Sequence, residues 1–226
     1  MANICLRAWN WFRRFRKRCG YGVHSPSDFY LITFVIYEKL PFYAYEPLHK
    51  LRKGLDSLPH YREKVDKLLL RLVNHYRPLL LLDVGVGGGL QTRYMAAGNT
   101  QMEILAHSDS HVDKVESFLT DVPHLSYGKI GIEEMKRKWK ELGTSDVMVH
   151  IGHTSQYRET FEALLPLAGE RTCFVIGTPH ANAAKKKWWK EVVADQRTGV
   201  TFDLYDVGFV FFDKKRIKEH RVVNFL

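Results

Sequence analysis

The feature that most constrains the fold is a glycine-rich turn directly after a run of apolar residues. Four leucines occupy positions 79–82, and the sequence "DVGVGGGLQT" follows at 83–92. Glycine permits positive φ angles and lets the backbone approach a ligand where a side chain would clash. A buried strand that leads through such a turn into a helix is typical of α/β proteins that bind a nucleoside.

The segments after this turn alternate between strand-like and helix-like patterns. Short apolar runs predict strands at 79–84, 102–106, 125–128, 146–151 and 172–177. Helical periodicity predicts helices at 90–97, 111–120, 131–142, 156–166 and 181–195. Such an alternation indicates parallel βαβ units. The stretch "TFDLYDVGFVFFDKK" at 201–215 instead predicts an antiparallel hairpin that ends the sheet.

Two helices and a covering loop are predicted before the turn. The first helix has Ser25 as its cap and runs to about residue 40. A second, amphipathic helix is predicted over 58–76, with one apolar face formed by Val65, Leu68, Leu69, Leu72 and Val73. The segment at 41–48 is expected to be a lid over the glycine turn. This segment has three aromatic side chains, Phe42, Tyr43 and Tyr45. They would either contact a substrate or pack within the fold.

Length and composition favour one domain with an N-terminal extension. The chain has 226 residues, 45% hydrophobic and 26% charged, and these ordinary values argue against disorder. We place the extension at 1–57 and the α/β domain at 58–226. No apolar stretch is long enough to cross a membrane and no secretory signal is evident, so a cytoplasmic location is expected. Three dispersed cysteines are expected to be free thiols: Cys5, Cys19 and Cys173.

The net charge of +9 is concentrated near the N-terminus. The stretch "RAWNWFRRFRKRCGYG" at 7–22 holds six cations, no acidic residue and several interleaved aromatic side chains. Two interpretations are open. The segment could form a basic amphipathic helix, with residues 7–18 contacting an anionic membrane surface or a nucleic acid, or a solvated helix whose aromatic side chains dock on the domain.

The glycine turn resembles the first motif of class I S-adenosylmethionine-dependent methyltransferases. In "DVGVGGG" an acidic residue precedes GxGxG, whereas Leu90 breaks the dinucleotide spacing GxGxxG. Further stretches, among them those at 21–39, 146–153, 179–192 and 203–215, resemble small bacterial O-methyltransferase-like proteins, which are distantly related to catechol O-methyltransferases. The resemblance covers nearly the whole chain. It implies a Rossmann-like sheet of seven strands with a reversed last strand, and S-adenosylmethionine bound by Asp83, Gly85, Gly87 and Gly89.

Acidic positions of that family pattern are altered in this chain. An acidic residue is implied at the end of the second strand, where it holds the ribose hydroxyls, but His107 stands there. Asp109 is the nearby carboxylate that could replace it, or it could simply be a turn residue. The positions implied for metal ligands hold Ile151, Gly177 and Thr178. Since none of these side chains supplies a carboxylate for a hard cation, metal-independent chemistry is expected.

Histidines are expected at the carboxyl ends of the fourth and fifth strands, where open parallel sheets bind ligands. His153 and His180 are the candidate catalytic bases, and His150 should point to the opposite side of its strand from Ile151. These histidines could instead be ordinary surface or core residues.

Three functions follow from these observations. The first is a methyltransferase that uses S-adenosylmethionine on a small-molecule hydroxyl or amine. The second is a catalytically inactive relative that keeps the fold as a binding or regulatory protein. The third is a protein that binds a polyanion or membrane surface through its basic N-terminus and "KKKWWKE" at 185–191. The sequence gives no oligomeric state.

Overall fold

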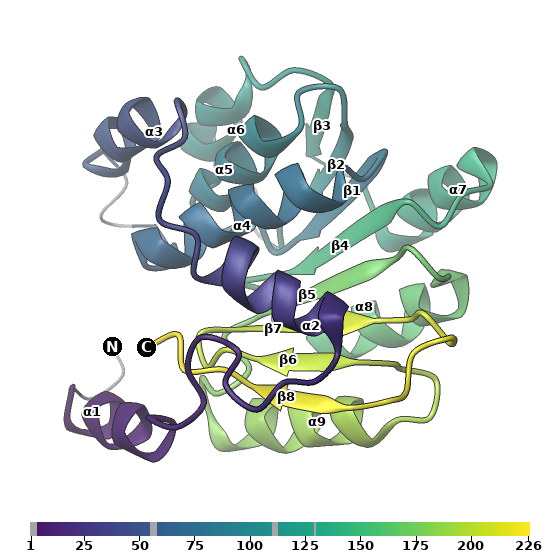
Figure 1. The fold of residues 1–226 in the computed structure, drawn as a ribbon. Helices are drawn as coiled ribbons and strands as arrows, with labels where there is room; N and C mark the ends of the chain where they lie inside the picture. Colours follow the sequence, from purple (N-terminus) through teal and green to yellow (C-terminus); the bar gives the residue numbers. More distant parts are fainter. Residues whose placement is uncertain (1–3, 55–57, 110–112, 129) are drawn as a thin grey trace.

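The computed structural model describes residues 4–54, 58–109, 113–128 and 130–226 (Figure 1). The N-terminal part contains helices α1 (Ile4–Arg13), α2 (Pro26–Tyr30), η1 (Leu31–Ile36), α3 (Tyr45–Arg52) and α4 (Glu63–Tyr76). The strands are β1 (Leu80–Val84), β2 (Glu103–His107), β3 (Leu125–Gly128), β4 (Val147–Ile151), β5 (Cys173–Gly177), β6 (Thr201–Asp203), β7 (Val207–Phe211) and β8 (His220–Val222). The helices between them are α5 (Leu90–Gly98), α6 (Asp113–Leu119), α7 (Ile132–Leu142), α8 (Tyr157–Leu164), the short η2 (Leu165–Leu167) and α9 (Ala183–Ala194).

The described strands form one sheet in the order β3-β2-β1-β4-β5-β7-β6-β8. Strands β1 to β5 are parallel, and β7 runs antiparallel to both β5 and β6. This confirms the Rossmann-like, mostly parallel sheet with its C-terminal antiparallel hairpin. The expectation of seven strands was one too few, because β8 pairs in parallel with the outer side of β6. With three residues, β8 is too short for its alternation to show in the sequence.

Helices cover both faces of the sheet (Figure 1). On one face, α4, α5, α6 and η1 pack against strand side chains such as Leu81, Ile104 and Val175. On the other, α7, α8 and α9 pack against the alternate side chains, including Leu82 and Phe174. The central strands are buried on both faces, which explains why they read as continuous apolar runs in the sequence.

The helices before the glycine turn differ from the prediction in their bounds. The apolar face predicted for 58–76 is buried, but α4 begins only at Glu63, and 58–62 is not helical. The helix predicted over 25–40 is divided into α2 and the π-helical η1, and it ends at Ile36. Ser25 caps α2 as expected, since its hydroxyl accepts a hydrogen bond from the Asp28 amide.

The predicted N-terminal extension shares the core of the domain. Side chains of η1 belong to the same apolar cluster as α4 and the sheet, among them Ile32 and Ile36 at 1% exposure. Helix α1 lies outside this cluster, beside β6 and β8 (Figure 1). Among the described residues, no helix combines the length and apolarity needed to span a membrane.

Candidate functional site

The glycine turn joins β1 to α5 at the carboxyl end of the sheet. Gly85 and Gly87 have φ angles of +82° and +56°, in a region that residues with a Cβ atom rarely adopt. The chain reverses its strand order next to this turn, because β1 is followed by β2 on one side and β4 on the other. This is the switch point where open α/β sheets bind ligands.

The loop after β4 closes this switch point. The amide of Gly152 donates to the carbonyl of Val84 (2.7 Å), and the amide of His153 donates to that of Gly85 (2.8 Å). The pairing of β1 with β4 therefore continues beyond the ends of both strands. A Cβ atom added at Gly85 would lie 2.7 Å from the His153 carbonyl carbon, so the backbones are in direct contact.

A second segment, residues 58–59, packs against the glycine turn. The amide of Gly88 donates to the carbonyl of Pro59 (2.8 Å). A Cβ atom at Gly87 would lie 2.6 Å from that carbonyl oxygen and 2.8 Å from the His153 ring, and one at Gly88 would lie 3.0 Å from Leu58. Residues 58–59 therefore fill the space that the glycines leave open.

Behind this cover lies a buried chain of hydrogen bonds that the sequence did not reveal. The hydroxyl of Tyr61 donates to Nε2 of His150 (3.0 Å), and Nδ1 of His150 donates to Asp83 (2.7 Å). Thr92 donates to the other oxygen of the same carboxylate (2.6 Å). Burial, and then the charge of Asp83, raises the pKa of Tyr61 well above its ordinary value. Asp83 is thus held inside the protein rather than presented to a ligand.

His153 lies against Tyr61, with their ring centroids 4.8 Å apart. Burial, reinforced by the neighbouring His150, lowers the pKa of His153 to about 4. Its Nε2 atom is buried without a hydrogen-bond partner among the described residues. The imidazole is therefore neutral at physiological pH and a weak base.

Asp109 holds two loops together. Its carboxylate accepts hydrogen bonds from the Thr154 hydroxyl (2.8 Å) and the Ser155 amide (3.0 Å), both in the loop after β4. His107, at the end of β2, accepts a bond from the Gly85 amide through its carbonyl (2.8 Å). The contacts of Asp109 thus join the chain after β2 to the loop after β4, and that of His107 joins the end of β2 to the glycine turn.

His180 belongs to a different cluster at the carboxyl end of β6. Its Nε2 atom donates to Asp203 (2.8 Å), and its ring stacks on Tyr205 at 5.0 Å. Burial alone would raise the pKa of Asp203, but the hydrogen bond from His180 and the ion pair with Arg14 hold it well below its ordinary value. The two candidate bases therefore lie in separate clusters, His153 against Tyr61 and His180 on Asp203.

Lys185, in the first turn of α9, is a further candidate that the sequence reasoning missed. Its side chain is 5% exposed, and Nζ lies 5.1 Å from the centre of the Tyr157 ring. Burial lowers its pKa to about 8. The signal in the sequence was its helical spacing to the buried Trp188 and Trp189, which sets Lys185 apart from the exposed Lys186 and Lys187.

The aromatic residues predicted to form a lid lie around α3 and α4. Tyr43 is fully exposed, whereas the hydroxyl of Tyr45 accepts a hydrogen bond from Arg71 of α4 (3.1 Å). Phe42 packs on Tyr45, with ring centroids 5.3 Å apart. The segment that contacts the glycine turn is thus 58–59, and α3 occupies part of the predicted loop.

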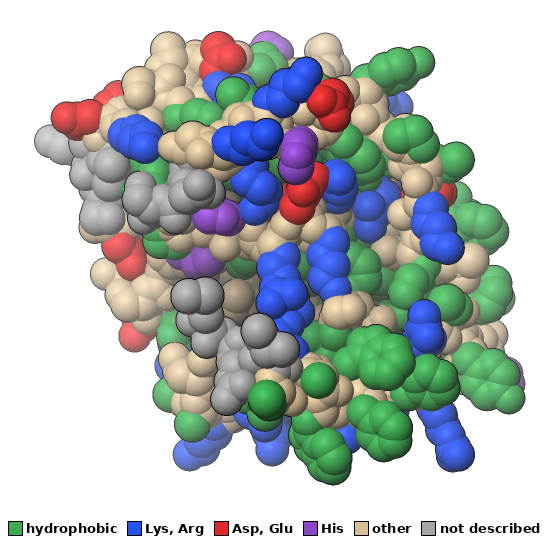
Figure 2. Space-filling view, turned by 90° about the vertical axis from the view of Figure 1, so that its left-hand side faces the viewer, with side chains coloured by type: hydrophobic (Ala, Val, Ile, Leu, Met, Phe, Trp, Pro, Cys, Tyr) green, Lys and Arg blue, Asp and Glu red, His purple; other side chains and the backbone are tan. Residues whose placement is uncertain are grey.

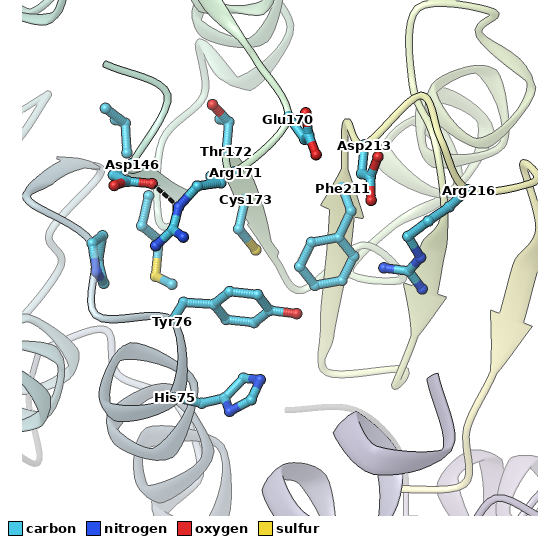
Figure 3. Close-up of a pocket in the computed structure, with 13 residues that line it drawn as sticks. His75, Tyr76, Asp146, Glu170, Arg171, Thr172, Cys173, Phe211, Asp213 and Arg216 are labelled. Carbon is cyan, nitrogen blue, oxygen red and sulfur yellow. Dashed lines mark hydrogen bonds and ion pairs between the residues drawn. The ribbon is translucent and has the colours of Figure 1, made fainter. Parts of the chain in front are cut away.

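A cavity of about 280 Å³ lies at the opposite edge of the sheet (Figure 3). Tyr76, Cys173 and Phe211 point into it, and Arg171 pairs with Asp146 at its rim. Burial raises the pKa of the Cys173 thiol. This cavity adjoins the amino ends of β4 and β5, away from the edge where parallel sheets bind their ligands, and its thiol is not activated.

Solved O-methyltransferase structures share this fold. A putative caffeoyl-CoA O-methyltransferase from Staphylococcus aureus is 11% identical, with a TM-score of 0.58 over 84% of this chain and 100% of its own. The O-methyltransferase TomG from Streptomyces achromogenes, in complex with SAM, is 16% identical, with a TM-score of 0.56 over 76% of this chain and 91% of its own. An O-methyltransferase from Bacillus cereus in complex with SAH is 15% identical, with a TM-score of 0.53 over 79% and 95%. No family model and no curated protein matches the chain.

Proposed function

We propose that this protein is an S-adenosylmethionine-dependent methyltransferase that acts on a hydroxyl or amine of a small molecule. The observation that carries the proposal is the positive-φ glycine turn after a buried β1, at the switch point of the sheet. Two structures of the same fold hold SAM or SAH. The structural likeness extends only to the fold. Assignment to a catechol-like subgroup is therefore also part of this proposal.

We further infer that the cofactor site at the turn is closed in the described conformation. Pro59 and His153 occupy the space next to Gly87, and Asp109 is bound to Thr154 and Ser155. Binding therefore requires residues 58–61 to move outward. It also requires Asp109 to exchange its internal partners for the ribose hydroxyls. Because only open molecules bind, the apparent affinity equals the affinity of the open form multiplied by the fraction of molecules that are open.

The bound cofactor would supply an activated methyl group, so the protein's task is to orient the acceptor, exclude water and receive a proton. Of the two proposed bases, His180 has a ring nitrogen available to take a proton. Its Nε2 atom is held by Asp203, which leaves Nδ1 to accept a proton from a substrate. His153 is neutral but weakly basic, because burial lowers its pKa.

We further propose that the reaction needs no metal. Ile151 and Gly177 have no side-chain atom that can bind a cation, and Thr178 offers only a hydroxyl. Deprotonation of the acceptor would then depend on an imidazole instead of a metal-bound oxygen.

A non-catalytic binding protein is the second candidate. It is favoured by the closure itself, since the Gly88–Pro59 and Asp109–Thr154 hydrogen bonds satisfy the groups that a cofactor would use. In that case the glycines are retained because they allow 58–59 and the loop after β4 to pack against the turn.

Calorimetry with S-adenosylhomocysteine distinguishes the two candidates. The proposed methyltransferase binds the ligand, and Asp109→Ala weakens binding about tenfold, because a ribose hydrogen bond to a carboxylate is lost. Asp213→Ala, at the opposite edge of the sheet, is the matched control and leaves affinity unchanged. No binding at millimolar ligand by the folded protein favours the non-catalytic candidate.

A further inference from the structure

Helix α1 docks on the domain through its arginines and not through its aromatic side chains. Arg7 is 8% exposed and forms two hydrogen bonds with Asp206, at 2.6 and 2.7 Å. Seven residues later, just beyond the end of α1, Arg14 pairs with Asp203 at 3.0 Å. Both guanidinium groups lie over the ring of Tyr205, at 5.5 and 5.3 Å from its centre.

The large apolar side chains of this segment remain exposed to a large extent. Its large side chains are exposed to between 38% and 69%: Leu6, Trp9, Trp11, Phe12 and Phe15. Helices of soluble domains bury their apolar face against the core. Here Arg7 and Arg14 make the ion pairs with the domain, which favours the first of the two interpretations over docking by the aromatic side chains. We call the surface formed by these five side chains the aromatic face.

Exposed cations surround the aromatic face. Arg13, Arg16, Lys17 and Arg18 are all exposed, and the described part of the chain supplies no carboxylate partner for their side chains. The stretch 4–22 contains no acidic residue. Figure 2 shows hydrophobic side chains gathered in the lower part of the face that carries α1, with Lys and Arg among them.

A basic cavity of about 690 Å³ lies between α1 and the start of α9, and Leu6 and Trp9 of the aromatic face line part of it. Arg13, Lys17 and Lys186 line it together with the stacked rings of His180 and Tyr205. These three cations have no described carboxylate partner, so the cavity can receive an anionic group such as a phosphate.

We propose that α1 docks the protein on an anionic lipid bilayer. The aromatic face enters the interface between headgroups and acyl chains, the surrounding cations bind the negative surface, and the basic cavity receives a lipid phosphate. The ion pairs of Arg7 and Arg14 fix the helix, so the domain binds in one orientation, with the His180 cluster toward the bilayer. This proposal does not depend on methyl transfer.

Other occupants fit this surface less well. A second copy in a two-fold dimer would bring the same cations against one another, since such an interface is self-complementary. A nucleic acid is bound mainly by outward-facing cations, whereas two of the six here, Arg7 and Arg14, are paired with Asp206 and Asp203 of the domain. The apolar Leu6 and Phe12 are exposed instead.

Co-sedimentation with vesicles tests the proposal. The probes are vesicles of phosphatidylcholine alone and with roughly a third phosphatidylglycerol. We expect binding only to the anionic vesicles, and release when the salt concentration is raised several-fold. Trp9→Ser with Phe12→Ser reduces partitioning at least tenfold, and Arg16→Gln with Arg18→Gln reduces it about thirtyfold.

Matched controls distinguish vesicle binding by this surface from nonspecific hydrophobic adsorption. Phe34→Ser with Tyr43→Ser removes two other exposed aromatic side chains and leaves partitioning unchanged. Lys186→Gln removes one cation of the cavity and weakens partitioning about fivefold; an unchanged value overturns the headgroup site. The whole proposal is overturned if anionic vesicles are not bound. It is also overturned if both aromatic pairs matter equally, if duplex DNA or RNA competes more strongly than vesicles, or if Trp9→Ser with Phe12→Ser dissolves a dimer.

Discussion

The buried Lys185 makes the stability of this protein depend on pH in a predictable direction. The ammonium lies against the Tyr157 ring and has no carboxylate partner among the described residues. Burial lowers its pKa from 10.5 to about 8. Between these values the unfolded chain holds one more proton than the folded protein, so the free energy of unfolding rises with pH from about 8 to about 10.5.

Replacement of this lysine by methionine measures the effect. A shift of about 2.5 pKa units corresponds to roughly 3 kcal/mol of penalty below pH 8. Loss of the contact with the Tyr157 ring offsets about 1 kcal/mol. Lys185→Met therefore raises the free energy of unfolding by about 2 kcal/mol at pH 7, and this advantage falls by about 2 kcal/mol by pH 9.5.

Urea unfolding followed by tryptophan fluorescence at both pH values gives the two differences. Lys186→Met is the control, because the neighbouring lysine is exposed and its replacement leaves the pH dependence unchanged. An equal effect of Lys185→Met at pH 7 and pH 9.5, or a loss of stability at pH 7, would refute the reasoning that burial of a charge dominates at this position.

Two further predictions concern the turn and the N-terminal helix. Gly87→Ala lowers the free energy of unfolding by about 3 kcal/mol, because it combines a positive φ with a clash against Pro59, whereas Gly143→Ala, at a similar φ but in open space, costs about 1 kcal/mol. Equal losses in thermal unfolding would show that the turn is not covered. Arg7→Gln leaves the Asp206 carboxylate without its ion-pair partner, so α1 detaches more often. Chymotrypsin is then expected to cleave within 4–15 about tenfold faster than in the control variant Arg13→Gln. Equal cleavage rates in the two variants would contradict the docking of α1.

Local patterns in the sequence were sufficient for most of the sheet. The strand predicted at 79–84 is β1 at Leu80–Val84, and that predicted at 172–177 is β5 at Cys173–Gly177. These segments are buried on both sides, so their composition alone marks them. The positive-φ glycines were equally visible, because few other residues adopt that conformation.

The closure of the site depends on contacts between distant residues, and no local pattern marks it. Tyr61 reaches His150, 89 positions away, although its own segment reads as the beginning of a helix. Pro59, in the same segment, offers its carbonyl to the glycine turn. The orientation of α1 was hidden for a similar reason, because Asp203 and Asp206, which attract its arginines, lie in the C-terminal hairpin.

The most direct test of the account is the affinity for S-adenosylhomocysteine after the covering segment is weakened. Tyr61→Ala removes the side chain that packs between His150 and His153, and the exposed Tyr43→Ala is its matched control. Both variants are first checked for native circular dichroism. We predict by calorimetry that Tyr61→Ala binds at least tenfold more tightly than the unmodified protein, while Tyr43→Ala is unchanged. A folded Tyr61→Ala variant with equal or weaker affinity, or with none, would contradict a cofactor site closed by residues 58–61.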